Sequence, residues 1–185
     1  GNKKVPFSEE DPVDKPVSLY AATKKSNELE AFTYHHLYGL NCWGLRFFTV
    51  YGPWGRPDMA LFKFTENILN DKPIDVYNQG QHKRDFTYID DIIDGVVAAI
   101  DKINGYQIFN LGNSTPVGLE YFIGLIEKNL NKKSQKNYLP LQPGDVVETY
   151  ADIDKAKKIL GYNPKTSIEE GVKKFINWYK DFNSK

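Results

Sequence analysis

The stretch "SLYAATKKSNELEAF", residues 18–32, predicts the helix from which the rest of the fold can be worked out. Ser18 is a suitable N-cap, because its side-chain oxygen can accept a hydrogen bond from a free backbone N–H of the first helical turn. The helical pattern runs from Leu19 to Tyr38, and Gly39 suits the left-handed conformation that ends many helices. Side chains at helical spacing predict a partly buried stripe on this helix: Leu29, Phe32, His36 and Leu37.

A strand is expected directly after this helix. "NCWGLRFFTVYG", residues 41–52, is rich in β-branched and aromatic side chains and ends in a Gly-Pro turn, which predicts a buried strand leading into a loop. Before the helix, three prolines within residues 1–17 favour an extended loop. Later strands are expected at 73–77, 84–89 and 106–112, with helices at about 60–71, 91–102, 118–130, 154–160 and 168–182. Because strands and helices alternate, the fold class is α/β.

Two more local expectations follow from the pattern. Asp90 is placed to cap the helix at 91–102, whose apolar side chains at helical spacing predict a buried stripe: Ile92, Val96, Val97 and Ile100. The lysine-rich segment Lys132–Lys136 is expected to be a solvated loop after a helix.

Composition limits the function classes. The 185 residues are enough for one substantial domain, and 24 basic against 24 acidic residues give no net charge that would attract a nucleic acid or a membrane surface. The single cysteine, Cys42, excludes an internal disulfide and fits a reducing compartment, so we expect a cytoplasmic protein. With one cysteine and no matching carboxylate spacing, no metal site is expected.

Tyr20 and Lys24 are four residues apart and therefore neighbours on one face of the helix. A free phenol has a pKa of about 10, and lowering it to about 7 takes roughly 4 kcal/mol. One ammonium about 4 Å away supplies about 4 kcal/mol at an effective dielectric constant of about 20. A lysine at this spacing could therefore make the phenol a general base, although so short a motif also occurs by chance.

Five ordered motifs extend the pattern: "SLYAATK", "GLRFFTVYGPWGRPDMA", "RDFTYIDDI", "FNLGNSTPV" and "LQPGDVVETYAD". Together they resemble the extended short-chain dehydrogenase/reductase family, and within it the NAD-dependent nucleotide-sugar epimerases that act on UDP-glucuronate. The resemblance implies part of a parallel Rossmann sheet plus a smaller α/β lobe that binds the nucleotide sugar. It also implies NAD as the cofactor, a UDP-sugar as the substrate and a place in polysaccharide biosynthesis.

The resemblance assigns the reacting groups. In this family hydride passes from C4 of the sugar to NAD and returns to the other face of the 4-keto sugar. The residue that matches the acid/base on the 4-hydroxyl is Tyr20. Lys24 would bind the nicotinamide ribose and depress the pKa of the tyrosine, and Phe48 would pack near the nicotinamide.

Two residues bear on the choice of sugar. Thr49 stands where the glucuronate-specific members carry threonine and many relatives carry asparagine. Arg56 matches a position beside the substrate carboxylate, and a guanidinium offers paired donors to such a group. The alternatives are an ordinary strand residue at Thr49 and a solvated loop arginine at Arg56.

Four further residues match the nucleotide site. Arg84 aligns with an arginine that contacts the diphosphate, although an ion pair with a neighbouring aspartate would also explain it. Asp145 aligns with the acid that binds the uridine ribose, and Gln142 replaces a common arginine nearby, which makes Arg84 more important. Val76 and Tyr77 match the strand that lines the uracil, and surface packing is an equal explanation for Tyr77.

The chain has no glycine-rich turn of the kind on which a dinucleotide pyrophosphate rests. It is therefore expected to be the C-terminal portion of a longer enzyme, unable to bind NAD tightly or to epimerise alone, and to expose an apolar surface. Residues 1–56 would be the Tyr-Lys helix and strand of the truncated Rossmann domain. Residues 57–185 would be mainly the substrate lobe, with segments that return to the Rossmann sheet. In the parent protein the Tyr-containing helix would take part in a homodimer.

Two alternatives to this assignment stay open. One is a different nucleotide-sugar epimerase or a 4,6-dehydratase that acts on a neutral sugar. The other is a non-catalytic module that only binds a UDP-sugar.

Overall fold

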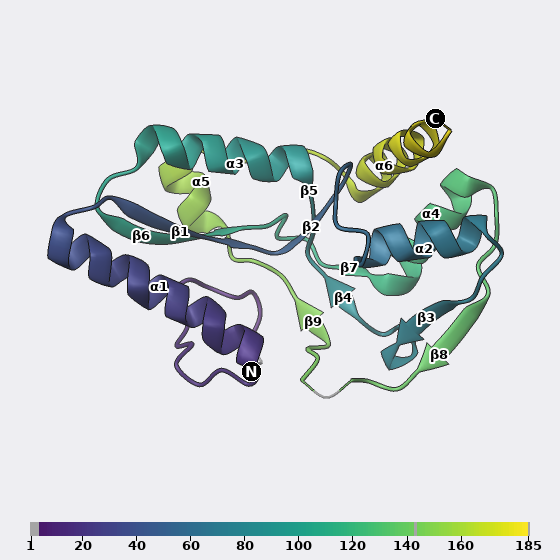
Figure 1. Ribbon diagram of the computed structural model, residues 1–185, viewed down its shortest axis with the longest axis horizontal. Helices are drawn as coiled ribbons and strands as arrows, with labels where there is room; N and C mark the ends of the chain where they lie inside the picture. The colour runs from purple at the N-terminus through teal and green to yellow at the C-terminus, as the bar shows by residue number, and fades with distance from the viewer. Residues whose placement is uncertain (1–3, 143, 185) are drawn as a thin grey trace.

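The computed structural model describes residues 4–142 and 144–184, and the first three residues of the expected leader loop lie outside that part. At one end of the molecule, a parallel strand pair carries helices on both faces (Figure 1). The helix α1 covers one face, and α3 and α5 cover the other. The bounds are α1 Leu19–Tyr38, β1 Cys42–Phe47, β6 Tyr106–Leu111, α3 Ile89–Lys102 and α5 Asp154–Leu160. The strands are in register from Cys42 opposite Tyr106 to Phe47 opposite Leu111.

Short sheets and three helices form the other end. Strand β2 (Thr49–Tyr51) runs parallel to β5 (Phe86–Tyr88), and β3 (Ile74–Tyr77) runs parallel to β8 (Lys136–Leu139). A small sheet has the order β7-β4-β9, with bounds Val117–Gly118, Lys83–Arg84 and Glu148–Thr149. The remaining helices are α2 Ala60–Leu69, α4 Leu119–Leu130, α6 Ile168–Asn183 and the 3₁₀ turn Asn78–Gly80. The α/β fold class is confirmed.

The buried apolar side chains form two clusters, one at each end. The larger cluster lies among β3, β5, α2, α4 and α6, where the rings of Phe86 and Phe122 stack with centroids 4.1 Å apart. The smaller cluster lies between β6 and the pair α3 and α5, around Phe109 and Leu111. Each end is thus held by its own core.

The expected ends of α1 are confirmed. The side chain of Ser18 accepts a hydrogen bond of 3.1 Å from the backbone N–H of Ala21. Gly39 has φ 67°, the left-handed region in which a side chain is disfavoured. Gly161 ends α5 in the same way, with φ 74°.

The expected burial of α1 and β1 is wrong. Leu29, Phe32 and Leu37 are 50–61% exposed, and His36 is exposed as well. The side of α1 toward the sheet instead carries smaller or polar residues, including Glu28, and no residue of this helix is buried. Strand β1 is half-buried rather than buried, because within the described residues it pairs only with β6.

The expectation for α3 is wrong in two respects. The helix begins at Ile89, so Asp90 lies in its first turn and does not cap it. Val97 and Ile100 are 50% and 66% exposed. The buried line runs instead through Ile92, Gly95 and Ala99. A Cβ at Gly95 would lie 2.9 Å from both Leu111 and Tyr162, so the sheet and the C-terminal segment approach the helix through this glycine.

The lysine-rich segment is not a free loop. Lys136 begins β8, a strand that the pattern did not predict. Lys132 pairs with Asp71 at 2.8 Å, and Lys136 pairs with Glu120 at 2.6 Å. The expected strand at 84–89 is also divided, because Asp85 separates β4 from β5.

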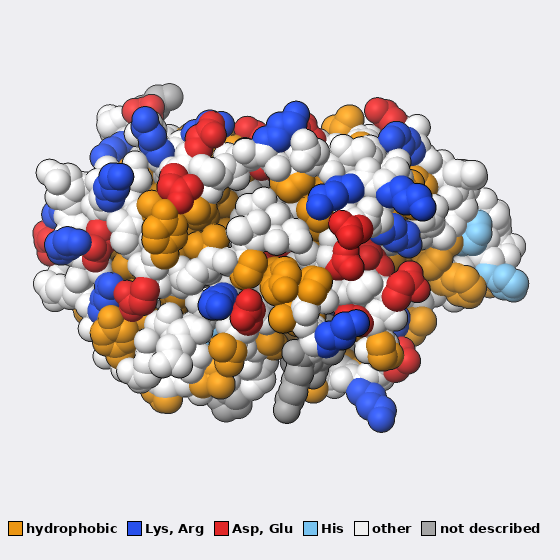
Figure 2. Space-filling model, turned by 180° about the vertical axis from the view of Figure 1, so that it is seen from behind, with side chains coloured by type: hydrophobic (Ala, Val, Ile, Leu, Met, Phe, Trp, Pro, Cys, Tyr) orange, Lys and Arg blue, Asp and Glu red, His pale blue; other side chains and the backbone are white. Residues whose placement is uncertain are grey.

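The surface mixes both signs of charge. Figure 2 shows basic and acidic side chains interspersed over one face, with hydrophobic side chains between them in several patches. This agrees with the zero formal net charge. Within residues 4–142 and 144–184, no helix has the length and apolar character needed to cross a bilayer.

Candidate functional site

The Tyr-Lys pair lies on the first turns of α1, as the spacing predicts. The Nζ atom of Lys24 is 5.5 Å from the centroid of the Tyr20 ring. Tyr20 is 71% exposed, so its hydroxyl is accessible to a ligand. The pair is therefore preformed on the helix, with the phenol presented to the outside.

An ion pair fixes this helix on the sheet. Arg46 of β1 donates two hydrogen bonds to the carboxylate of Glu28, at 2.6 and 2.9 Å. Tyr106 of β6 donates a hydrogen bond of 3.0 Å to the backbone oxygen of Glu28. Burial acts to raise the pKa of Glu28, but the bonds from Arg46 and Lys25 outweigh it and lower the pKa. The hydrogen bonds that Arg46 donates to Glu28 raise the pKa of Arg46, against the effect of burial.

Phe48, Thr49 and Arg56 lie on or after the turn that follows β1. Phe48 is half-buried and packs against the smaller core, with its ring centroid 6.4 Å from that of Phe7. Thr49 and Arg56 both line a small cavity of about 50 Å³ between β2, β5 and the start of α2. The guanidinium of Arg56 is 74% exposed and lies 3.3 Å from the carboxylate of Asp58. The structure thus brings Thr49 and Arg56 together, with Arg56 paired to a neighbour.

Arg84 lies on β4, and the charge of Asp145, in the segment before β9, acts on it. One terminal nitrogen of Arg84 donates to the backbone oxygens of Lys83 and Val147, at 3.1 Å each, and so holds the loop before β9. Burial lowers the pKa of the Arg84 guanidinium, and the charge of Asp145 opposes that shift. Hydrogen bonds to two carbonyls leave further N–H donors of the guanidinium for a ligand.

His82 is a residue that the sequence analysis did not assign to the site. Its side chain is 7% exposed, and its Nε2 atom lies 3.7 Å from Oδ2 of Asp145. No spacing or motif singled it out, because only the tertiary structure places the carboxylate of Asp145 beside it.

The two residues of β3 that the sequence assigned to the site, Val76 and Tyr77, differ in burial. Val76 is completely buried in the larger core, so its side chain cannot line a binding site. Tyr77, at the end of the strand, is half-buried. Only Tyr77 of this pair presents a side chain to the outside.

Asp85 organises the loops around Arg84. This fully buried carboxylate accepts hydrogen bonds from the backbone N–H groups of Asn113, Ser114 and Ala151, at 2.7–3.1 Å. Burial raises the pKa of Asp85, while those hydrogen bonds act in the opposite direction. The carboxylate thereby joins three segments that are distant in the sequence.

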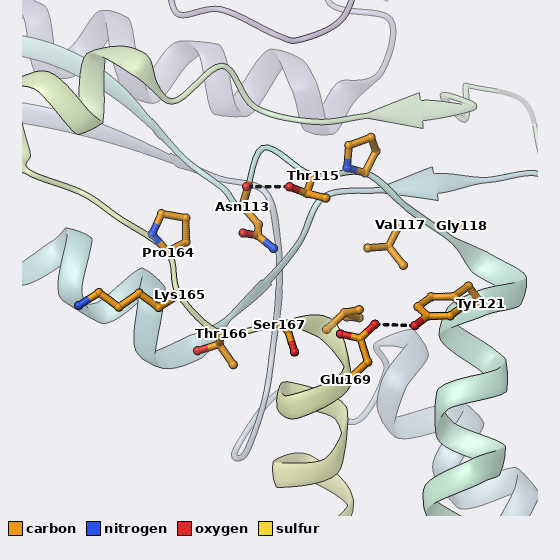
Figure 3. Close-up of a pocket in the computed structure, with 12 residues that line it drawn as sticks. Asn113, Thr115, Val117, Gly118, Tyr121, Pro164, Lys165, Thr166, Ser167 and Glu169 are labelled. Carbon is orange, nitrogen blue, oxygen red and sulfur yellow. Dashed lines mark hydrogen bonds between the residues drawn. The ribbon is translucent and has the colours of Figure 1, made fainter.

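A cavity of about 500 Å³ lies next to the loops that Asp85 joins (Figure 3). It is open to the surface and is lined by the turn after β6, the start of α4 and the segment that leads into α6. Across it, the hydroxyl of Tyr121 bonds to the carboxylate of Glu169, which raises the pKa of the phenol. Asp91 accepts backbone hydrogen bonds from Lys165 and Thr166, both at 3.0 Å, and so fixes the wall. None of the residues assigned from the sequence lines this cavity.

Comparison with known proteins gives the family. The model of the NAD dependent epimerase/dehydratase family matches residues 1–112, which is more than half of the chain. The chain belongs to this family. The resemblance seen in the five motifs is thereby confirmed.

Individual relatives agree with this assignment. The chain is 65% identical over 179 residues to the uncharacterized protein MJ1055 of Methanocaldococcus jannaschii, covering 97% of this chain and 55% of that protein. It is 50% identical over 198 residues to UDP-glucuronate 4-epimerase 1 of Arabidopsis thaliana, covering 98% and 46% respectively. It thus spans about half the length of the curated relatives it matches.

A solved structure supports the fold as well. The UDP-glucuronic acid 4-epimerase of Bacillus cereus, in complex with UDP-glucuronic acid and NAD, superposes with a TM-score of 0.92 at 36% identity. The match covers 98% of this chain and 58% of that one. The β1–β6 pair with its flanking helices is therefore part of a Rossmann-type architecture.

Proposed function

We propose that the protein containing this chain is an NAD-dependent epimerase that inverts C4 of UDP-glucuronate. The observation that carries this proposal is the accessible Tyr20–Lys24 pair, in a chain that is 36–50% identical to UDP-glucuronate 4-epimerases of two organisms. Because the chain spans about half the length of such relatives, the activity is proposed for the whole protein.

NAD, when bound, would accept and return the hydride at C4 of the sugar. The exposed first turns of α1 fit such a ligand, since both the phenol and the ammonium are accessible there. Tyr20 would take the proton of the 4-hydroxyl as C4 is oxidised, and return it to the 4-keto oxygen as C4 is reduced. Lys24 would bind the nicotinamide ribose, stabilise the phenolate by its charge and hold the ring of Tyr20 in place. Phe48 would pack beside the nicotinamide.

Arg84 and Asp145 would hold the nucleotide. The free donors of the Arg84 guanidinium suit a diphosphate, and the carboxylate of Asp145 suits the ribose hydroxyls. The half-burial of Tyr77 fits a contact with the uracil, whereas Val76 can serve only through its backbone.

Thr49 and Arg56 would select the uronate. The salt bridge between Arg56 and Asp58 is exposed on both sides, so a substrate carboxylate can compete for the guanidinium. A neutral-sugar epimerase remains the second candidate, because Asp58 already neutralises Arg56 in this structure.

The deciding experiment uses the full-length protein with NAD. UDP-glucuronate and UDP-glucose are supplied separately, and the 4-epimers are quantified by chromatography. We expect inversion of UDP-glucuronate at a much higher kcat/KM. Turnover of UDP-glucose alone would replace the uronate assignment with the neutral-sugar one, and binding of both without turnover would support a non-catalytic module.

A further inference from the structure

His82 carries a polar side chain that is buried in the fold. Its side chain is 7% exposed, and within the described part of the chain neither ring nitrogen has a hydrogen-bond partner. In contrast, Nδ1 of His35 lies 2.7 Å from the backbone oxygen of Leu40. A buried donor or acceptor without a partner is unfavourable, so native proteins seldom retain one without a reason.

The backbone of His82 is fixed in the small sheet. Its carbonyl accepts a hydrogen bond of 2.9 Å from the N–H of Leu119, at the start of α4. The next residue, Lys83, donates a bond of 2.9 Å to the carbonyl of Val147. The ring is therefore held at a defined place beside the segment that contains Asp145 and Val147.

The carboxylate above it is less constrained. Asp145 is 41% exposed, and its Oδ2 lies 3.7 Å from Nε2 of His82. Its backbone N–H bonds to Gln142 within the same loop. A hydrogen bond of about 2.8 Å would therefore need the carboxylate to approach the ring by only about 0.9 Å.

His82 directly precedes β4, and the alternation of side chains along an extended chain sets which neighbours share its side. Lys83 points to the other side, where it pairs with Glu148 at 3.7 Å. Residues two apart in an extended chain point to the same side, so His82 and Arg84 face the loop together. The charge of Asp145 acts on Arg84 as well. The imidazole and the guanidinium thus both face the one carboxylate that the proposed function assigns to the ribose.

We propose that His82 is a positioning residue for nucleotide binding. When a nucleoside diphosphate binds, an N–H of the ring donates to one oxygen of the Asp145 carboxylate and leaves the other oxygen to accept from the ribose hydroxyls. This inference rests on the proposed function, because it takes Asp145 as the ribose ligand.

The test compares two substitutions of His82 by calorimetry with UDP and with 2′,3′-dideoxyuridine diphosphate, which lacks both ribose hydroxyls. His82→Leu removes the donor, and His82→Gln retains one. We expect His82→Leu to weaken UDP binding about tenfold and His82→Gln to stay within about threefold of the wild type. For the dideoxy ligand, and in an Asp145→Asn background, His82→Leu is expected to have no effect.

A spectroscopic measurement covers the case in which His82→Leu fails to fold. The chain has only three histidines, so the ring ¹⁵N signals of His82 can be assigned in the wild type. Addition of UDP should shift them, and Asp145→Asn should abolish that shift. Equal weakening of both ligands by His82→Leu, or ring signals that do not respond to UDP, would overturn the inference and leave the proposed function intact. Failure of the wild type to bind UDP would overturn both.

Discussion

Arg46 on β1 and Glu28 on α1 are joined by two hydrogen bonds, from Nε to Oε1 at 2.6 Å and from Nη2 to Oε2 at 2.9 Å. Glu28 lies one helical turn beyond Lys24 and two beyond Tyr20, so all three occupy neighbouring positions along the helix. The helix has no buried residue. This ion pair therefore helps to fix the helix, and with it the Tyr-Lys pair, against the sheet.

Replacement of Glu28 by Gln should destabilise the protein by about 1–2 kcal/mol, because it leaves the half-buried guanidinium of Arg46 with a weaker partner. Urea unfolding followed by circular dichroism measures the change. The matched control is Lys157→Met, which removes an exposed pair with Asp154 and should cost less than about 0.5 kcal/mol. Equal effects for the two variants would contradict the importance assigned to Glu28.

The same pair predicts a pH dependence. The pKa of Glu28 is lower in the folded protein than its ordinary value of 4.5, so the folded state holds this carboxylate charged more readily than the unfolded state. Its stabilising contribution is present above pH 4.5 and is lost as the pH falls through the lowered pKa. The free-energy difference between wild type and Glu28→Gln should shrink over that range, as measured by urea unfolding at a series of pH values. A difference that stays constant there would rule out this linkage.

Substitution of Tyr20 by Phe in the full-length protein should reduce kcat for C4 inversion by about 10²–10⁴, the usual contribution of a positioned acid/base. Tyr34→Phe is the matched control, since Tyr34 is an exposed phenol on the same helix, and it should keep wild-type kcat. Initial rates of epimer formation provide the measurement. Normal turnover by Tyr20→Phe would remove the phenol from the mechanism.

Arg84 and Lys83 form a natural pair for testing the nucleotide site, because adjacent residues of β4 point to opposite sides. Arg84→Met should weaken UDP binding by more than about tenfold, since it removes a charge-assisted donor from the diphosphate. Lys83→Met removes only the salt bridge with Glu148 and should change the affinity by less than about threefold. Calorimetry measures the UDP affinity of both variants. A larger loss of affinity in Lys83→Met than in Arg84→Met would place the diphosphate elsewhere.

Asp85→Asn should cost about 2–4 kcal/mol of stability, because the buried carboxylate bonds three backbone N–H groups from two distant segments. The substitution replaces one carboxylate oxygen by an NH₂ group, so at least one of these N–H donors would face another donor instead of an acceptor. Asp75→Asn, an exposed position on β3, is the control and should change stability by less than about 0.5 kcal/mol. Thermal unfolding measures both variants, and similar melting temperatures for the two would refute the structural role of Asp85.

Local signals in the sequence determined both ends of α1 and the C-terminal end of α5. Ser18 caps the start of α1 and Gly39 its end, and Gly161 ends α5. Such caps can be predicted from the sequence because a capping residue acts on backbone groups no more than one helical turn away. The motifs likewise sufficed for the family, since they record side chains at fixed spacing in the chain. The assignment of Tyr20 and Lys24 to one face needed only the helical repeat.

The tertiary structure alone decided which faces are covered and which loops meet. Helical spacing places Leu29 and Phe32 on one side of α1 but does not show how far another element covers it. Here the rings of Phe32 and Tyr106 meet edge to face, and Leu29 and Phe32 both stay at least half exposed. Strand β8 gave no local signal, because its pairing with β3 joins residues about 60 positions apart. The approach of Asp145 to His82 arises in the same way, from a loop that folds back over β4. Long-range pairing depends on the whole chain, so no short stretch of sequence could have revealed it.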